Sequence, residues 1–290
     1  LSRKFGHEAY RNMLGPLYGG LYASDPRDMP MRHSLSRALK HFGVEGSVLL
    51  ALLRRRGNDR APALSFRRGL RALPDALCAA HEQHVRLGEG VERVRRGEDG
   101  WIVETAGGET HAEHVVFTTP ADVTARLLGP IAREAADRLS RLTYNPLAVV
   151  HLLADGVPVQ AMGYQVAFGE RLETRGVTFN HCLFGRDGVY TVFLGGAKNP
   201  DLVALPDEHI AAVAAGEFRI VTGRAARVLH VSRVRIPAWD RSWDSLDGLT
   251  LPHGIHLAAN FESRAGIPGR LARARQLAEQ LAGYGTRVPA

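Results

Sequence analysis

The sequence is poor in cysteine and contains no long uninterrupted apolar run. Only two cysteines, Cys78 and Cys182, occur in 290 residues, and they lie far apart. A disulfide framework is therefore excluded, and a reducing compartment is the simpler interpretation. No run approaches the roughly 18 apolar residues expected of a membrane-spanning helix. We therefore predict a cytoplasmic protein without a transmembrane segment.

The sequence also lacks the glycine pattern of a dinucleotide-binding loop. No Gly-x-Gly-x-x-Gly occurs, and the nearest approach, Gly88-Glu89-Gly90-Val91, has neither a third glycine nor a following helix. The first residue is leucine instead of methionine. We expect the chain to be the C-terminal portion of a longer protein whose first part carries that loop.

The charge of the chain is positive, with a formal net charge of +7 and a pI near 9.8. Arginines are spread along the sequence, which fits solvated surfaces but also an acidic ligand or a membrane surface. No basic stripe with interleaved aromatics occurs, so nucleic acid is not an expected partner. The apolar run 48–53 precedes three arginines, 54–56. This pattern fits a core helix with a basic end or peripheral contact with the inner face of the plasma membrane.

The first quarter of the chain has the apolar spacing of helices. Residues 1–60 are expected to form a helical segment, with Gly15-Pro16 ending the first helix. A second helix is predicted over residues 70–80, where Pro74 is tolerable only in the first turn. Short strands follow over residues 85–94, 101–103 and 115–117. The last is apolar without alternation, as in a strand covered on both faces.

A larger sheet is predicted from about Tyr144, followed by a closing strand, turn and helix. Its expected strands are 148–153, 163–168, 176–180, 190–195 and 228–236, with a helix over 207–221. The strand 255–259 and a glycine-containing turn then lead to a helix from near Leu271, lined by Leu271, Ala274, Ala278 and Leu281. Such a turn lets the backbone approach an anionic cofactor. We expect a mixed fold of the α+β or α/β class.

Five segments, taken in order, carry a resemblance to a known family. They are 18–26, 66–77, Val91 with 115–121, the strand pair 176–180 and 190–196, and 258–268. In this order the chain resembles the C-terminal two-thirds of the protoporphyrinogen oxidase family, flavoenzymes of the amine-oxidase-like FAD group. The resemblance implies an incomplete, glutathione-reductase-like FAD-binding domain, a helical segment and an inserted mixed β-sheet substrate domain. The expected boundaries are 1–60 for the helical segment, 61–128 with 251–290 for the FAD-binding part, and 129–250 for the sheet.

The implied activity is oxidation of a porphyrinogen to a porphyrin in haem biosynthesis, with FAD as the cofactor and O2 as a possible acceptor. The flavin would accept a hydride while the protein positions the reactants. No catalytic side chain is required, and none is assigned. Two alternatives stay open: a flavin amine oxidase or carotenoid-type desaturase, and an inactive flavoprotein-like fragment that serves as a binding domain.

The resemblance also implies site residues, each with an ordinary structural alternative. Residues implied to contact FAD are Val91, Thr119, Pro120, Asn260, Gly266 and Ile267. Residues implied to line the tetrapyrrole pocket are Tyr164, Gln165, Ala167 and Phe193. The alternatives are a plain strand valine, strand termination, a helix cap and sheet-core packing. No metal site is expected, because the histidine pairs 111/114 and 253/256 have no cysteine or carboxylate at ligand spacing.

Two departures from the family pattern bear on activity. The chain has Arg67-Arg68-Gly69 where consecutive glycines are usual, and Ala258-Ala259-Asn260 where an Ala-Gly-Asn is usual. Each change puts a side chain where the backbone would otherwise be bare. We hypothesise that Arg67 or Arg68 pairs with a carboxylate of the substrate.

Overall fold

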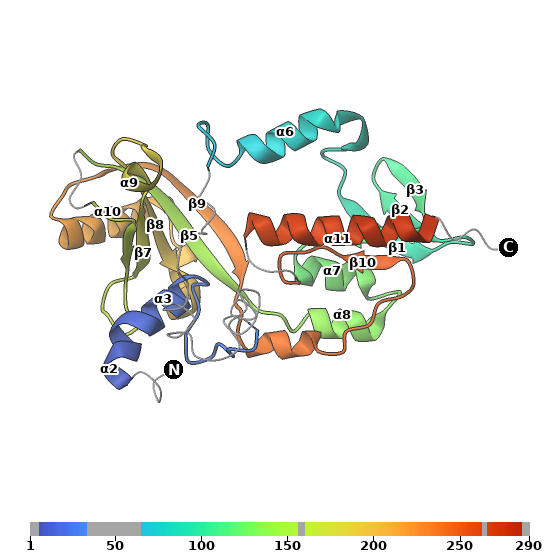
Figure 1. Ribbon diagram of the computed structural model, residues 1–290, viewed down its shortest axis with the longest axis horizontal. Coiled ribbons are helices and arrows are strands. Elements are labelled where there is room, and N and C mark those ends of the chain that lie inside the picture. The colour runs from blue at the N-terminus through green and yellow to red at the C-terminus, as the bar shows by residue number, and fades with distance from the viewer. Residues whose placement is uncertain (1–5, 34–64, 156–159, 263–265, 286–290) are drawn as a thin grey trace, which may run out of the picture. The chain divides into compact units, whose positions relative to one another are not determined.

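The computed structural model describes residues 6–33, 65–155, 160–262 and 266–285 (Figure 1). The chain folds into two compact units, each discontinuous in sequence. One comprises Leu1–Ala63 and Thr143–Trp243, and the other Leu64–Leu142 and Asp244–Ala290. The sheet domain was expected to begin at residue 129, whereas the chain enters the first unit at Thr143. The expectations for residues 34–60, including the apolar run 48–53 and its arginines, lie outside the described residues.

The first unit opens with a helical stretch that does not stop where expected. Helix α2 (His7–Ala9) continues through a π-helical turn, η1 (Tyr10–Leu14), into α3 (Gly15–Gly20). The predicted end at Gly15-Pro16 is therefore wrong. Pro16 lies in the first turn of α3, where its missing N–H is tolerated. A Cβ on residue 15 would lie only 2.9 Å from the Tyr10 carbonyl oxygen, so the turn requires glycine there.

A five-stranded sheet forms the body of the first unit. Its strands are β5 (Tyr144–Leu153), β6 (Gly163–Gln165), β7 (Thr174–Phe179), β8 (Val189–Gly195) and β9 (Arg227–Pro237). They are arranged in the order β6-β7-β8-β5-β9, and every neighbouring pair is antiparallel. All five predicted strands are present, although β6 ends at Gln165 and not at residue 168 as expected.

One face of this sheet is sealed by α10 (Asp207–Thr222). Ile210, Ala214 and Phe218 recur every four residues and are fully buried, as expected for the apolar stripe of an amphipathic helix. They form one core with the alternate residues of β5 and β8, among them Val150 and Val192. Because side chains alternate across a strand, Val149, His151, Thr191 and Phe193 project from the opposite face.

The segment after α3 is anchored to the end of β8 and to β5. Ala197 donates its backbone N–H to the Ala23 carbonyl at 2.8 Å. The buried Asn145 side-chain amide donates to the same carbonyl at 3.1 Å and to the Ser24 hydroxyl at 2.7 Å. Gly196 has φ +70° and lies so close that a Cβ would come within 2.5 Å of that carbonyl oxygen. The close approach therefore depends on glycine.

The first unit is completed by short helical elements. These are α9 (Asn180–Phe184), η3 (Gly196–Lys198), η4 (Pro200–Ala204) and η5 (Arg241–Leu246), the last of which runs across the boundary between the units.

The second unit contains two small sheets. Strands β1 (Val91–Arg96), β2 (Trp101–Thr105) and β3 (Gly108–Ala112) form an antiparallel meander. Strands β4 (Val115–Phe117) and β10 (Ile255–Leu257) pair in parallel although they are far apart in the chain. Phe117, Ile255 and Leu257 are buried, whereas Val115 and Val116 are only half-buried. The expectation that 115–117 is covered on both faces therefore holds for its last residue alone.

The helices of the second unit are α6 (Ala72–Ala80), η2 (Glu82–His84), α7 (Ala121–Leu128), α8 (Arg133–Leu139) and α11 (Ile267–Gly285). Helix α11 begins at Ile267 instead of near Leu271, because Pro268 is tolerated in a first helical turn. The predicted lining is also wrong in part: Leu271, Ala274 and Ala278 are exposed, whereas Leu277 is buried. Among the described residues, no helix is both long and apolar enough to cross a membrane.

Candidate functional site

The strand ends of the second unit form the first candidate site. Because β4 and β10 are parallel, their carboxyl ends, Phe117 and Leu257, lie at the same edge. A helix follows each strand in the chain: Pro120 precedes α7, and α11 begins at Ile267, after β10. Strand ends that feed helix N-termini form an edge where anionic groups bind in open α/β sheets.

The expected FAD-contacting residues all lie in this unit. The turn from β4 into α7 contains Thr119 and Pro120, and the turn after β10 contains Asn260. Gly266 and Ile267 begin α11, and Val91 begins β1 in the other sheet of the unit. The structure therefore brings Thr119, Pro120 and Asn260 to one edge, while Val91 belongs to a separate sheet.

Two arginines in the first turns of α11 hold the turn that follows β10. Arg270 donates to the Ala259 and Asn260 carbonyls at 2.6 and 2.8 Å. Arg273 donates to the Leu257 carbonyl at 2.9 Å and pairs with the Glu262 carboxylate at 2.8 Å. Burial raises the pKa of Glu262, an effect that the two arginines oppose. The two guanidinium groups add to the positive end of the helix dipole.

The backbone at the start of α11 is open to close approach. Gly266 has φ +89°, and among the described residues a Cβ placed there would meet Pro268 Cδ alone, at 3.8 Å. A bare backbone beside a helix N-terminus suits an anionic group such as the pyrophosphate of a dinucleotide, and the two arginines fix the turn beside it through their carbonyl and Glu262 contacts. These residues therefore fit the phosphate-bearing part of FAD.

The Thr119 side chain has an ordinary structural role, which was the alternative to FAD contact. Its hydroxyl lies 2.7 Å from the hydroxyl of Thr124, which is fully buried. Thr124 also donates its backbone N–H to the Pro120 carbonyl at 2.9 Å. The Thr119 side chain thus supports the start of α7.

Arg67 and Arg68 lie in the turn that precedes α6. Gly69 donates its backbone N–H to the Phe66 carbonyl at 2.9 Å and has φ +90°. Both arginine side chains are exposed within the described part of the unit.

The expected substrate residues of the first unit are divided between the two faces of the sheet. Tyr164 pairs with Val177 on the face sealed by α10, and its ring meets Phe179 edge-on at 6.1 Å. Burial raises the pKa of Tyr164 to about 12. Gln165 pairs with Gly176, which in turn pairs with Phe193, on the other face. Ala167 lies in the loop after β6.

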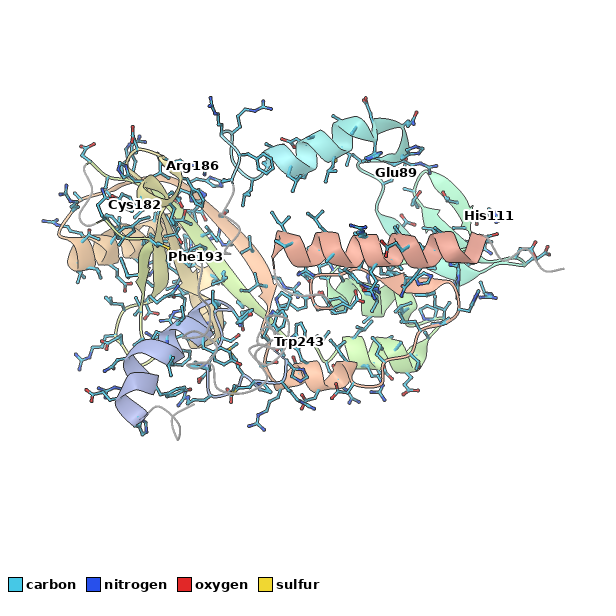
Figure 2. The ribbon with its side chains drawn as sticks, viewed as in Figure 1. Glu89, His111, Cys182, Arg186, Phe193 and Trp243 are labelled. Atoms are coloured by element: carbon cyan, nitrogen blue, oxygen red, sulfur yellow. The ribbon has the colours of Figure 1, made fainter. Side chains whose placement is uncertain are left out.

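The face opposite α10 contains both apolar and polar side chains, and we call it the platform face. It comprises Val149, His151, Gln165, Thr191 and Phe193. Gln165 reaches across Gly176 and contacts Gly20 of α3. Figure 2 shows Phe193 among the side chains of this sheet, with Arg186 at the end near α9. A flat apolar molecule could stack on Phe193 and Val149.

A polar row on the platform face was not anticipated from the sequence. Asn180 Nδ2 donates to Thr191 Oγ1 at 2.6 Å, and Thr191 Oγ1 lies 3.3 Å from His151 Nδ1. His230 is the β9 partner of His151. The strand alternation of β5 and β8 could have placed His151 and Thr191 on one face, but their pairing register could not be known.

A histidine cluster in the second unit was also missed. His256 Nε2 lies 3.1 Å from His114 Nδ1, and the rings of His114 and His253 lie 6.3 Å apart. The parallel pairing of β4 and β10 brings these histidines together. In the described part of the chain no group of three or more histidine, cysteine or acidic side chains could hold a metal ion.

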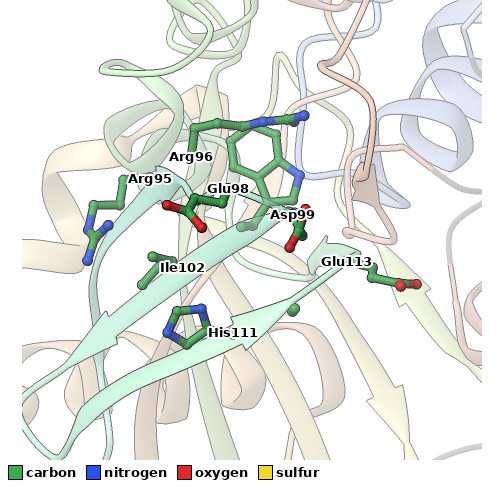
Figure 3. A pocket seen from close by; sticks show the side chains of 11 residues that line it. Arg95, Arg96, Glu98, Asp99, Ile102, His111 and Glu113 are labelled. Carbon is green, nitrogen blue, oxygen red and sulfur yellow. The ribbon is translucent and has the colours of Figure 1, made fainter.

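Two cavities among the described residues lie away from the residues expected to bind FAD or substrate. The larger, of about 740 Å³, lies over the meander and is lined by Arg95, Trp101 and His111 among others (Figure 3). Its cations are already engaged: Arg95 pairs with Glu104 and Glu109, and Arg96 stacks over Trp101 at 5.0 Å. The second cavity, of about 280 Å³, lies between the first helices and Phe168. Neither is lined by a residue expected to bind FAD or substrate.

Comparison with known proteins identifies the family. The family model described as "Flavin containing amine oxidoreductase" matches residues 1–246. The chain belongs to this family. The resemblance to amine-oxidase-like flavoproteins, the oxidoreductase class and the FAD cofactor that it implies are thereby confirmed at the level of the family.

Curated relatives of this family member include proteins named protoporphyrinogen oxidases. The chloroplastic protoporphyrinogen oxidase of Nicotiana tabacum is 26% identical over 254 residues, which cover 75% of this chain and 46% of the relative. The protoporphyrinogen oxidase of Homo sapiens is 29% identical over 226 residues, covering 67% and 46%. The chain therefore spans about half the length of the curated relatives that it matches.

Solved structures show the same fold. A crystal structure of a candidate protoporphyrinogen oxidase from Exiguobacterium sp. 255-15 superposes with a TM-score of 0.78 at 22% identity, covering 97% of this chain and 65% of that one. Wild-type putrescine oxidase bound to putrescine superposes with a TM-score of 0.56 at 14% identity, covering 74% of this chain and 53% of that one. The mixed α/β architecture is therefore that of the flavin-dependent amine oxidase group.

Proposed function

We propose that the protein is an FAD-dependent oxidoreductase that oxidises a porphyrinogen to a porphyrin. The observation that carries this proposal is the family match over residues 1–246, and it is supported by curated relatives that are named protoporphyrinogen oxidases. The reaction belongs to the haem biosynthetic pathway and uses O2 as acceptor in this proposal.

The second unit serves as the incomplete glutathione-reductase-like part that holds FAD, and the sheet of the first unit is the inserted substrate domain. Asn260, Gly266 and Ile267 border the cofactor at the start of α11, with Thr119 and Pro120 at the neighbouring strand end and Val91 on the adenine side. The open backbone at Gly266 and the arginines of α11 support this assignment. Bound FAD supplies the hydride acceptor.

The platform face is the substrate side in this proposal. Phe193 and Gln165 contact the macrocycle, and Ala167 borders it from the loop after β6. Tyr164 packs on the other face of the sheet, against Phe179. An apolar ring suits a large flat molecule through stacking and burial of area. The side chains orient the substrate and exclude water, which is what such a reaction needs from the protein.

The test uses the full-length protein with its complete reading frame. We expect a yellow protein with the visible absorbance of bound flavin that converts a porphyrinogen to a fluorescent porphyrin in the presence of O2. Parallel assays with an amine and a polyene separate the substrates. Oxidation of the amine alone would replace the porphyrinogen by an amine, and a folded but colourless protein would indicate a binding domain without activity.

Arg67 and Arg68 are proposed to pair with a substrate carboxylate, and the same assay tests them. Exchange of both for alanine is expected to raise KM for a carboxylate-bearing porphyrinogen with little change in flavin absorbance, because exposed cations act on the charged substrate and not on the fold. Arg71→Ala is the matched control, since Arg71 is an exposed neighbour that already pairs with Asp75. Unchanged turnover in the double variant would remove this role.

A further inference from the structure

The polar row of the platform face has an ordered set of donors and acceptors. Thr191 is buried at 8% exposure and Asn180 at 7%. Among the described residues, the Thr191 hydroxyl contacts Asn180 Nδ2 and His151 Nδ1. The amide donates to it, and in the tautomer with an unprotonated Nδ1 the hydroxyl donates its hydrogen to His151. His151 is then neutral, with its proton on Nε2.

The Nε2–H of His151 is the unused end of this chain of hydrogen bonds. Within the described part of the chain, the hydrogen-bond contact of the His151 ring is the one between Nδ1 and Thr191. The ring is only half-buried. Burial lowers the pKa of His151, and so do the positive charges of His230 and Arg186. These two groups belong to β9 and to the loop after α9, and among the described residues no acidic group adds an opposing charge at His151.

The row lies one step along the strands from the apolar part of the platform face. Thr191 and Phe193 are two residues apart on β8, and His151 and Val149 are two apart on β5. Side chains two residues apart on a strand are separated by about 6.6 Å. A ring stacked on Phe193 and Val149 would therefore place a short side arm at His151.

We propose that the Asn180–Thr191–His151 row is a recognition site for a carboxylate on the edge of the substrate, with His151 Nε2–H as the donor. The positive surroundings favour an anion, and the fixed ring orientation favours one oxygen acceptor. This inference rests on the proposed function, because that proposal takes the platform face as the substrate side. His151 would act as a specificity residue, not as a group that takes part in the oxidation.

The test measures binding of two porphyrins to the full-length flavoprotein by fluorescence quenching. Protoporphyrin carries two carboxylates, and its dimethyl ester carries none. In His151→Leu the Kd for the acid is expected to rise about tenfold or more, with the Kd for the ester unchanged. His151→Gln, which keeps a neutral N–H donor, is expected to stay near the wild-type protein. His209→Leu is the matched control, because His209 is exposed on α10, behind the sheet. An equal loss for acid and ester, or no loss, would overturn the site.

A second measurement separates this inference from the proposed function. Glutarate, a small dicarboxylate, is titrated into the wild-type protein with ¹³C-labelled histidine, and the His151 signal is identified by its absence in His151→Gln. A saturable shift of that signal supports the carboxylate site even if neither porphyrin binds, a result that would remove the porphyrinogen as substrate. The opposite outcome is that glutarate does not shift the His151 signal and that His151→Leu binds both porphyrins as the wild type does. This outcome would disprove the carboxylate site without contradicting the proposed function.

Discussion

Single residues set the electrostatics of the strand pair β4–β10. His256, in the middle of β10, has a lowered pKa, chiefly because it is partly buried and also because His114, Arg273 and His253 add positive charge. A proton on His256 would therefore meet two further imidazoles and a guanidinium. The geometry follows from the parallel register, in which His256 pairs with Val116 and its ring lies against that of His114 at 5.1 Å.

This histidine cluster predicts a stability that falls on acidification. Because the pKa of His256 is lower in the folded protein than its ordinary value of about 6.5, the unfolded chain takes up the proton first as the pH falls. The contribution is fully present above about pH 6.5 and is lost as the pH falls through the folded pKa. Urea unfolding at about pH 7.5 and pH 5 measures the loss.

The comparison variant for that experiment is His256→Gln, which should lose less stability between the two pH values than the wild-type protein does. His209→Gln serves as the control, because His209 is exposed and lies on α10 in the other unit. Identical losses in wild type and His256→Gln would show that His256 does not titrate on unfolding.

At the scale of elements, one carboxylate ties a helix to the start of a strand. Glu217 of α10 accepts the backbone N–H groups of Glu173 and Thr174 at 2.7 and 2.8 Å, and the Thr174 hydroxyl at 2.5 Å. The backbone donors at the beginning of β7 would otherwise be unsatisfied near the core. Helix α10 thus seals the sheet through its apolar stripe and orders β7 through this contact.

Glu217→Ala is expected to destabilise the first unit by about 2–4 kcal/mol, since each buried donor left unsatisfied costs about 1–3 kcal/mol. Glu217→Gln should cost less, because the amide oxygen still accepts a hydrogen bond. Glu208→Ala is the control, an exposed position in the first turn of the same helix, for which a cost below about 1 kcal/mol is expected. Urea unfolding followed by circular dichroism gives the values. Equal costs for the two alanine variants would disprove the role of Glu217.

At the scale of the whole molecule, each unit contains buried residues of its own. Phe218 and Tyr190 are fully buried in the first unit, and Leu128, Leu139 and Phe261 in the second. Elements far apart in the sequence meet in each, as β5 meets β9 and β4 meets β10. Local stability should therefore follow the units instead of the order of the chain.

Amide hydrogen exchange can test this division. Phe218→Ala removes a fully buried ring, which costs about 3–5 kcal/mol in a core, and should speed exchange in β5, β7 and β8 while β4 and β10 keep their protection. Leu277→Ala, at a buried position of α11, is the converse variant and should speed exchange in β4 and β10. Faster exchange throughout the chain in both variants would indicate one cooperative unit.

Much of the element list could be predicted from local pattern. Alternation in 228–236 and the apolar runs at 148–153 and 190–195 correspond to β9, β5 and β8. The end of the first helix at Gly15-Pro16 was wrong because a π-helical turn, which no local pattern reveals, accommodates the proline. The prediction of which side of α11 is buried was wrong in part, because several apolar residues of this helix are exposed. Apolar spacing therefore did not identify the packed face.

The order of its motifs was enough to determine the flavoprotein family of this chain, since turns with required glycines and apolar strands are local properties that survive low identity. Pairing across the chain was decided only by tertiary structure. It placed Tyr164 and Phe193 on opposite faces of one sheet, and it brought His151 to Thr191 and His114 to His256. Strand register arises from contacts between distant segments, and a shift of one residue would exchange the two faces.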